Sequence, residues 1–156
     1  MATISFKSVG TKASENRAPT VPVPTPIGIV TPMQLGEGSD GIFGMHRNLG
    51  EQIADNLRNL ILTNHGERLG QYDLGANLKA LVFDYSSNPE WESEAMSNIK
   101  TAVAKFMPFV ELESFETSID TNNDPQLATV SITVSFNVPA AGVSNKAVRV
   151  FFEAGG

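Results

Sequence analysis

Apolar residues recur at helical spacing in the middle of the chain and at every second position near its C-terminus. Five of them predict an amphipathic helix over residues 49–65: Leu49, Ile53, Leu57, Leu60 and Ile61. The other faces of this helix carry polar residues: Glu51, Gln52, Asp55, Arg58 and Asn59. Asn48 followed by Glu51 resembles a capping box at the start, and Gly66 suits the residue that closes the last turn.

Two further helices are predicted downstream. Asp73 is a candidate N-cap for a helix with four apolar residues on one side: Leu74, Leu78, Leu81 and Val82. Asn88-Pro89-Glu90 then combines a cap residue, a proline suited to the first helical position and an acidic residue near the positive end of the dipole. Pro108 ends this third helix, whose buried face is expected to contain Trp91, Ala95, Met96, Ile99, Val103 and Phe106.

After Pro108 the period of the pattern changes to two. Five apolar residues alternate with polar ones and predict a strand with one buried face: Val130, Ile132, Val134, Phe136 and Val138. Residues 109–119 alternate less regularly, which indicates a bulge near Ser114. Residues 121–125 supply a turn. A third strand, residues 146–152, is expected at an edge, where it can pair with a strand of another chain.

These elements predict an α+β fold in which helices pack on a small three-stranded, mostly antiparallel sheet. Residues 1–40 are expected to form an extended arm and a glycine-rich linker, because prolines remove backbone donors. The prolines are Pro19, Pro22, Pro24, Pro26 and Pro32. Interleaved Val and Ile residues favour an arm laid along neighbouring subunits over the alternative, a disordered tail. Residues 41–156 are then a single domain.

Composition excludes several function classes. A net charge of −6 and a pI near 4.8 argue against a nucleic-acid binder. The absence of cysteine excludes disulfides, thiolate catalysis and Cys-based zinc sites. No apolar run approaches the roughly 20 residues that span a bilayer, and the first ten residues lack a signal-peptide pattern, so we expect synthesis in the cytoplasm. Two histidines, His46 and His65, are too few for a His-based metal site, and no cofactor is expected.

Glu67 and Arg68 follow the helix-ending Gly66 directly, and three roles are open to them. Glu67 could act as a catalytic acid with His65 or Asp73 nearby, as in glycoside hydrolysis, although sequence spacing alone does not establish a substrate cleft. The two residues could instead form a local salt-bridged turn. In the third role they clamp a protein partner, since arginine offers a planar fork of donors and the glutamate accepts hydrogen bonds.

The order of elements resembles a known family. Thr63-Asn64-His65-Gly66-Glu67-Arg68 ends a helix, Leu74-Gly75 leads into Leu81-Val82-Phe83, and a longer helix and three strands follow. Residues 41–152 are similar to the baseplate wedge and sheath-initiator family of contractile-tailed phages, which is also called lysozyme-like and has relatives in type VI secretion. The family commonly has a proline and an aromatic residue before the later glycine, where this chain has Gln71-Tyr72-Asp73-Leu74.

The resemblance implies a structural protein of the virion tail baseplate rather than an enzyme. It implies that Glu67 and Arg68 dock on wedge proteins. It also implies that the terminal strand adds to the first ring of tail sheath protein, through Lys146, Ala147, Val148, Arg149, Val150, Phe151 and Phe152. Several copies in a sixfold assembly are expected, with the tail tube as a further contact. The alternative is a peptidoglycan-cleaving, lysozyme-like hydrolase that uses Glu67.

Overall fold

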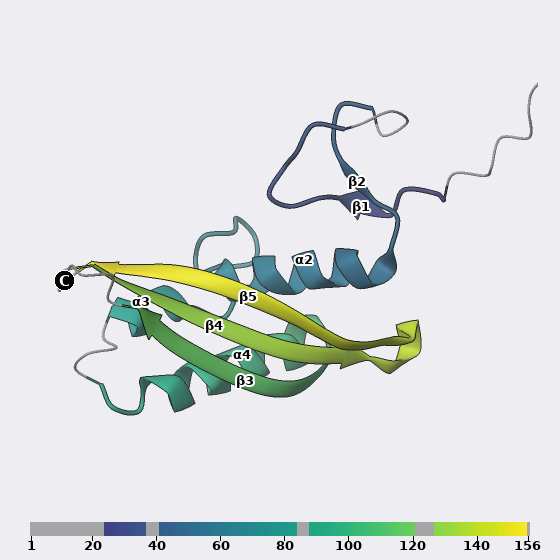
Figure 1. Ribbon diagram of the computed structural model, residues 1–156. Helices are drawn as coiled ribbons and strands as arrows, with labels where there is room; N and C mark the ends of the chain where they lie inside the picture. Colours follow the sequence, from purple (N-terminus) through teal and green to yellow (C-terminus); the bar gives the residue numbers. More distant parts are fainter. Residues whose placement is uncertain (1–23, 37–40, 84–87, 121–126, 156) are drawn as a thin grey trace, which may run out of the picture.

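A three-stranded antiparallel sheet lies in front of the helices, and a small hairpin lies outside α2 (Figure 1). The computed structural model describes residues 24–36, 41–83, 88–120 and 127–155. Its helices are α2 (Leu49–Leu62), α3 (Leu78–Phe83) and α4 (Trp91–Phe106). The strands of the main sheet are β3 (Glu111–Asp120), β4 (Leu127–Val138) and β5 (Val143–Gly155), and the 3₁₀ turn η1 (Pro139–Ala141) precedes β5. This arrangement confirms the α+β class.

The strand order of the main sheet is β3-β4-β5, so β4 is central and β5 is an edge strand, as the sequence predicts. Every second residue of β4 from Ala128 onward is buried, and this set contains all five predicted residues: Val130, Ile132, Val134, Phe136 and Val138. The pairing of β3 with β4 shifts between Leu112 and Ser114, which confirms the predicted bulge. The turn expected at residues 121–125 lies outside the described residues.

Helix α2 packs through Ile53, Leu57, Leu60 and Ile61 of its predicted apolar stripe, but Leu49 is exposed, and the helix is shorter than predicted. Asn48 caps its start, where the side-chain Oδ1 accepts a hydrogen bond from the Gly50 N–H (2.8 Å). The helix ends at Leu62, not at residue 65, because Thr63 has an extended backbone (φ −79°, ψ 133°). The hydroxyl of Thr63 donates to the Asn59 carbonyl (2.6 Å) and satisfies one carbonyl of the last turn.

The predicted start of the second helix is wrong. Helix α3 begins at Leu78, because Gly75 (φ 114°) and Asn77 (φ 51°) have left-handed backbone conformations that a right-handed helix cannot contain. Asp73 therefore caps no helix and instead pairs with Lys105 of α4. The first turn of α3 is capped from a distant segment, since the Lys79 N–H donates to Asn64 Oδ1 (3.2 Å).

Helix α4 completes the core through its predicted apolar face, but it starts two residues later than predicted, at Trp91 with Glu90 as its N-cap, so Pro89 is not its first residue. Asn88 precedes it and accepts a hydrogen bond from the Glu90 N–H (2.9 Å). Four of its six predicted core residues are buried, namely Trp91, Ala95, Ile99 and Val103, while Met96 and Phe106 are half-buried. The helix stops before Met107-Pro108.

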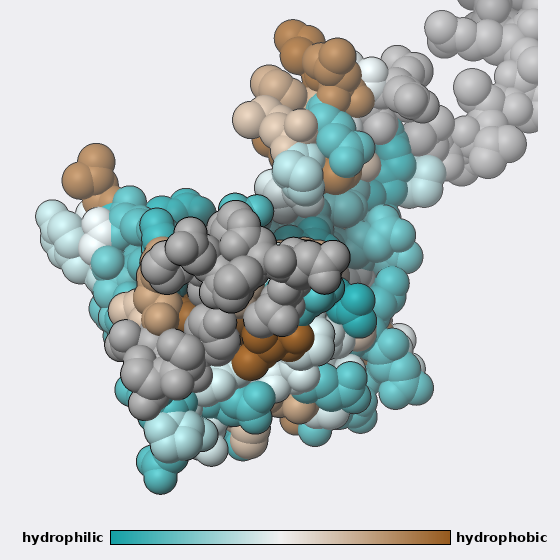
Figure 2. Space-filling model, turned by 60° about the vertical axis from the view of Figure 1, so that its left-hand side comes forward, coloured by the Kyte–Doolittle hydropathy of each residue, from teal (hydrophilic) through white to brown (hydrophobic). Residues whose placement is uncertain are grey.

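The hairpin consists of β1 (Gly28–Ile29) and β2 (Met45–His46), paired antiparallel, with a further bridge between Leu35 and Phe43. The hairpin pairs residues of the expected N-terminal arm (1–40) with residues of the expected domain (41–156). The boundary between arm and domain at residue 40 stays a prediction. The first 23 residues of the proline-rich arm lie outside the described residues. Figure 2 shows apolar side chains on this projecting part of the molecule.

Candidate functional site

The turn after α2 is built around Asn64 and Glu67. One carboxylate oxygen of Glu67 accepts a hydrogen bond from the Asn64 N–H (2.9 Å), and the other accepts one from the Asn64 side-chain amide (2.8 Å). Because Asn64 also caps α3, this single amide side chain connects the turn to the next helix. Glu67 therefore has a structural role in holding the turn.

The hydrogen bonds to Glu67 also determine its ionisation. Donation from the Asn64 side chain, and then from its backbone N–H, lowers the pKa of the Glu67 carboxyl below its ordinary value. A general acid in glycoside hydrolysis needs the opposite shift, because it must hold a proton near neutral pH. The environment of Glu67 thus opposes the catalytic role that the sequence left open.

Gly75 brings the end of the loop back against α2. Its φ of 114° suits glycine, and a Cβ at this position would lie 2.0 Å from the Thr63 carbonyl oxygen. This close approach lets the next residue, Ala76, donate its N–H to the Leu60 carbonyl (3.2 Å). The Leu74-Gly75 motif is therefore explained by the need to close the C-terminal end of α2.

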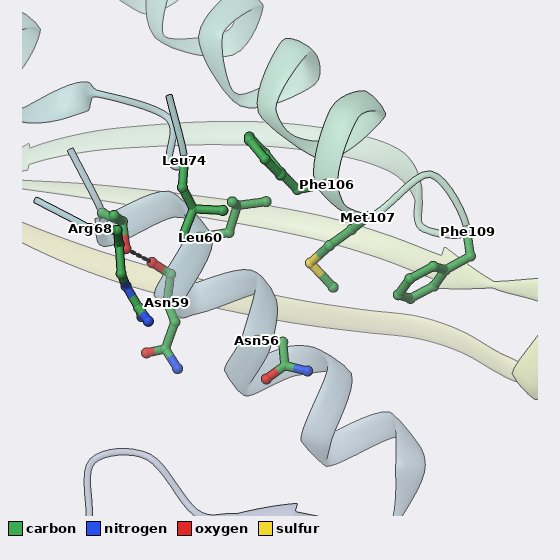
Figure 3. Close-up of a pocket in the computed structure, with 9 residues that line it drawn as sticks. Asn56, Asn59, Leu60, Arg68, Leu74, Phe106, Met107 and Phe109 are labelled. Atoms are coloured by element: carbon green, nitrogen blue, oxygen red, sulfur yellow. Dashed lines mark hydrogen bonds between the residues drawn. The ribbon is translucent and has the colours of Figure 1, made fainter. Parts of the chain in front are cut away.

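Arg68 lies at one end of a hollow of about 320 Å3 between α2 and the end of α4 (Figure 3). We call it the α2–α4 hollow; it is lined by Asn56, Asn59, Leu60, Thr63, Arg68, Leu74, Phe106, Met107 and Phe109. The Arg68 side chain extends beside Asn59, whereas Phe109 lies at the other end. Arg68 is the one charged side chain among these described lining residues.

The structure does not pair Glu67 with Arg68. Within the described ranges, the side chain of Arg68 forms no hydrogen bond or ion pair, whereas the side chain of Glu67 is held by Asn64. The local salt-bridged turn is therefore not the arrangement observed. The guanidinium of Arg68 keeps its donors available to a partner.

Strand β5 has one buried and one exposed face. Val148 and Val150 point into the core, while Ala147, Arg149 and Phe151 are exposed on the other face, as the alternation predicts. The Arg149 Nε donates to Thr133 Oγ1 of β4 (3.1 Å). Lys146 and Phe152 are half-buried. A strand that pairs with β5 would meet its backbone edge, with these exposed side chains beside it.

The end of β5 and the Asn64–Glu67 turn, distant in sequence, line the same hollow of about 440 Å3, which we call the β5 hollow. Its lining residues are Leu62, Asn64, Glu67, Lys79, Val82, Phe83, Thr129, Phe151, Phe152 and Glu153. The structure thus brings Glu67 and the terminal strand together. Arg68 lies in the other hollow, so the two consecutive residues face different surroundings.

Sequence reasoning missed a polar cluster that attaches the hairpin to α2. Asp55 was expected on a polar face but is 7% exposed. Its Oδ2 accepts hydrogen bonds from the Thr31 N–H (2.8 Å) and His46 Nε2 (2.7 Å), and its Oδ1 pairs with Arg58 (2.7 Å). The position of Asp55 next to the apolar stripe of α2 was the one sequence signal that it could be buried. Nothing in the neighbouring sequence indicated Thr31 and His46 as its partners.

Burial alone would raise the pKa of the Asp55 carboxyl, but the hydrogen bonds from His46 and Thr31 together hold it below its ordinary value. The carboxylate is therefore ionised at neutral pH and holds together the hairpin and α2. Among the described residues no group of three or more His, Asp or Glu side chains is arranged to hold a metal ion, and no helix there is long and apolar enough to cross a membrane.

Comparisons with known proteins give a family match and two similar folds. Residues 47–142 match the family model described as baseplate wedge protein gp25. No curated protein sequence matches the chain. The cryo-EM structure of the sixfold-symmetrised baseplate of the anti-feeding prophage contains a chain that is 13% identical, with a TM-score of 0.51 over 81% of this chain and 82% of that one. A proposed tail lysozyme from Geobacter sulfurreducens is 21% identical, with a TM-score of 0.48 over 67% of this chain and 88% of that one.

Proposed function

Because the chain belongs to the baseplate wedge protein gp25 family and is thus a structural baseplate component, we propose that it joins the baseplate to the contractile sheath. In this proposal the turn with Glu67 and Arg68 docks on other wedge proteins, and β5 offers its backbone to the first ring of sheath protein. The observation that carries the proposal is that β5 is an edge strand of the sheet. Strand addition supplies main-chain hydrogen bonds to a partner.

The choice between the two edges of the sheet supports β5 over β3. Strand β3 contains a bulge and carries four acidic residues: Glu111, Glu113, Glu116 and Asp120. Bulges and charges are the features by which edge strands avoid pairing with other chains. Strand β5 pairs continuously with β4 from residue 146 to residue 155 and keeps a regular edge over that length.

The unpaired guanidinium supports docking through Arg68. The α2–α4 hollow is lined by apolar side chains that include Leu60, Phe106 and Met107, and Arg68 supplies a cation at its end. A wedge-protein segment with an apolar face and a carboxylate complements both features. Glu67 contributes by holding the turn that presents Arg68, and its remaining lone pairs can accept donors from a partner.

The proposal also specifies where the protein acts and in how many copies. The protein acts in several copies within a sixfold baseplate of the virion tail, and it is made in the host cytoplasm. The N-terminal arm extends toward neighbouring subunits or the tail tube. The protein is not an enzyme in this proposal, and purified wild-type protein is expected to leave peptidoglycan intact. Cleavage that is lost in Glu67→Ala would favour the hydrolase instead.

Docking is tested with Arg68→Ala and the matched control Lys100→Ala, which removes an exposed positive charge from α4. Co-assembly with the wedge proteins of the same machine is measured by size-exclusion chromatography. We expect Arg68→Ala to lose co-assembly and Lys100→Ala to retain it. Equal behaviour of both variants would exclude a docking role for Arg68.

Strand addition needs a test that leaves β5 in place. Deleting residues 146–156 would remove Val148 and Val150 from the core and unfold the domain. Hydrogen–deuterium exchange on the intact chain avoids this problem. Binding of the sheath protein is expected to slow exchange of backbone amides in residues 146–152 and to leave β3 unchanged. Protection that is confined to β3, or absent from both edges, would contradict the proposal.

A further inference from the structure

The β5 hollow combines apolar walls with a charged rim. Three large apolar side chains around it remain exposed: Leu62 (41%), Phe83 (50%) and Phe151 (61%). Leu62 is the last residue of α2, Phe83 is the last residue of α3, and Phe151 lies in the C-terminal half of β5. The hollow is therefore formed by tertiary packing at the point where the terminal strand passes the helices.

The rim of the hollow carries more negative than positive charge. Glu67 stands on the α2 side and Glu153 on the β5 side, while Lys79 of α3 is the one cation among the described lining residues. Lys79 lies near enough to Glu67 to interact with it electrostatically. With two carboxylates and one ammonium group, the rim has a net negative charge and attracts a cation.

We propose that the β5 hollow receives a single basic side chain, arginine or lysine, from the strand that adds to β5. The inference rests on the proposed strand addition and specifies what the added strand must contain. An arginine or lysine buries an aliphatic stem on apolar surface while its charged end stays at the rim. The walls formed by Leu62 and Phe151 fit such a stem, and Glu67 and Glu153 fit its charged end.

The geometry of an added strand supports one such side chain. A strand paired with β5 lies about 4.8 Å from it, and its side chains alternate between the two faces of the sheet. Because the hollow is lined by Phe151, Phe152 and Glu153, it adjoins the end of β5 rather than the whole strand. One residue of the added strand therefore faces the hollow, and this residue also sets the register of pairing.

Glu67 can take part without giving up its structural contacts. Each of its carboxylate oxygens accepts one hydrogen bond from Asn64, and an ionised carboxylate has about four acceptor sites. The Asn64 bonds fix the carboxylate in position before a partner arrives. A basic side chain thus meets an acceptor that is already oriented, which reduces the entropic cost of binding.

The test uses ¹⁵N-labelled full-length protein and nine-residue peptides of alternating threonine and valine with one variable central residue. The central residue is arginine, its neutral analogue citrulline, or glutamate. Affinity is measured from shifts of the backbone amides of residues 148–153. We expect the arginine peptide to bind about three- to fivefold more tightly than the citrulline peptide, and the glutamate peptide to bind most weakly.

Matched variants test whether the preference for the arginine peptide is caused by the charged rim of the β5 hollow. Glu67→Gln and Glu153→Gln are expected to remove most of the arginine preference and to leave citrulline binding unchanged. Glu116→Gln, on the opposite edge strand, should behave as wild type. Lys79→Gln should increase the arginine preference, a result that a purely structural role for the rim would not give.

The outcomes separate this inference from the proposed function. Equal binding of the arginine and citrulline peptides at β5 would overturn the basic-residue preference and leave strand addition intact. An arginine preference that persists in Glu67→Gln and Glu153→Gln would also overturn it. Binding of no peptide to β5 would count against strand addition itself and against the hollow together.

Discussion

Glu67 and Arg68 are consecutive residues that line different hollows: Arg68 lines the α2–α4 hollow together with Asn59, and Glu67 lines the β5 hollow together with Phe151. The turn between α2 and α3 therefore presents two chemically distinct surfaces. Arg68 is unpaired within the described ranges, whereas Glu67 is bonded to Asn64. Substitutions at the two positions should have separable effects.

Glu67→Ala is expected to lower the melting temperature, because it removes both acceptors of the Asn64 donors. Arg68→Ala is expected to leave the melting temperature unchanged, since no intrachain bond is lost. Thermal unfolding followed by circular dichroism measures both. A larger loss of stability in Arg68→Ala than in Glu67→Ala would contradict this assignment.

Gly75→Ala should destabilise the protein by at least about 2 kcal/mol, because the new Cβ would overlap the Thr63 carbonyl at a positive φ. Gly66→Ala is the matched control: its φ is also positive (88°), but nothing lies within 4 Å of the added Cβ. About 1 kcal/mol is expected there. Urea unfolding measures both values, and equal losses would show that contact with Thr63 is unimportant.

Asp55 should make attachment of the hairpin sensitive to acid. Its folded pKa lies below the ordinary value of 3.8, so the stabilisation is complete above that unfolded value and is lost as pH falls through the folded one. The groups that face it are His46, Arg58 and the Thr31 N–H, with Glu51 beside His46.

The measurement for Asp55 is the pH dependence of unfolding between about pH 6 and pH 2, compared with Asp55→Asn. The variant should be less stable at neutral pH and should lose less stability on acidification. If acid destabilised the variant as steeply as wild type, other carboxylates would be responsible.

Leu57→Ala should cost about 3 kcal/mol, because Leu57 is fully buried in the core between α2 and the sheet. Leu69→Ala is the control, since Leu69 is 95% exposed, and a change within about 0.5 kcal/mol is expected. Chemical denaturation measures both. A small effect at Leu57 would mean that the core can collapse around the missing side chain.

Much of the fold could be predicted because buried residues recur at every second position in a strand and at every third or fourth position in a helix. The alternation in β4 and the stripe in α4 identify the buried faces without knowledge of their neighbours. The motif around Gly66 and Gly75 indicated the baseplate wedge family, and the match of residues 47–142 to the gp25 family model confirms that resemblance. The start of α3 could not be predicted from Asp73, because the left-handed residues Gly75 and Asn77 delay the helix.

The sequence was sufficient to select the candidate site residues, but it did not predict how these residues are arranged in space. The sequence identified Glu67, Arg68 and the terminal strand as the polar turn and the free edge of the domain. It could not show that Glu67 lines one hollow with the end of β5 while Arg68 lines another between α2 and the end of α4, because both hollows are formed by elements far apart in the sequence.

Local periodicity and turn chemistry, which are properties of neighbouring residues, thus determined the elements, the class of fold and the candidate residues. Tertiary packing determined the partners of Asp55, the separation of Glu67 from Arg68 and the hollow at the end of β5. These features could not be predicted from the sequence because their contacts join residues far apart in the chain. Local spacing contains no information about which distant side chains will meet.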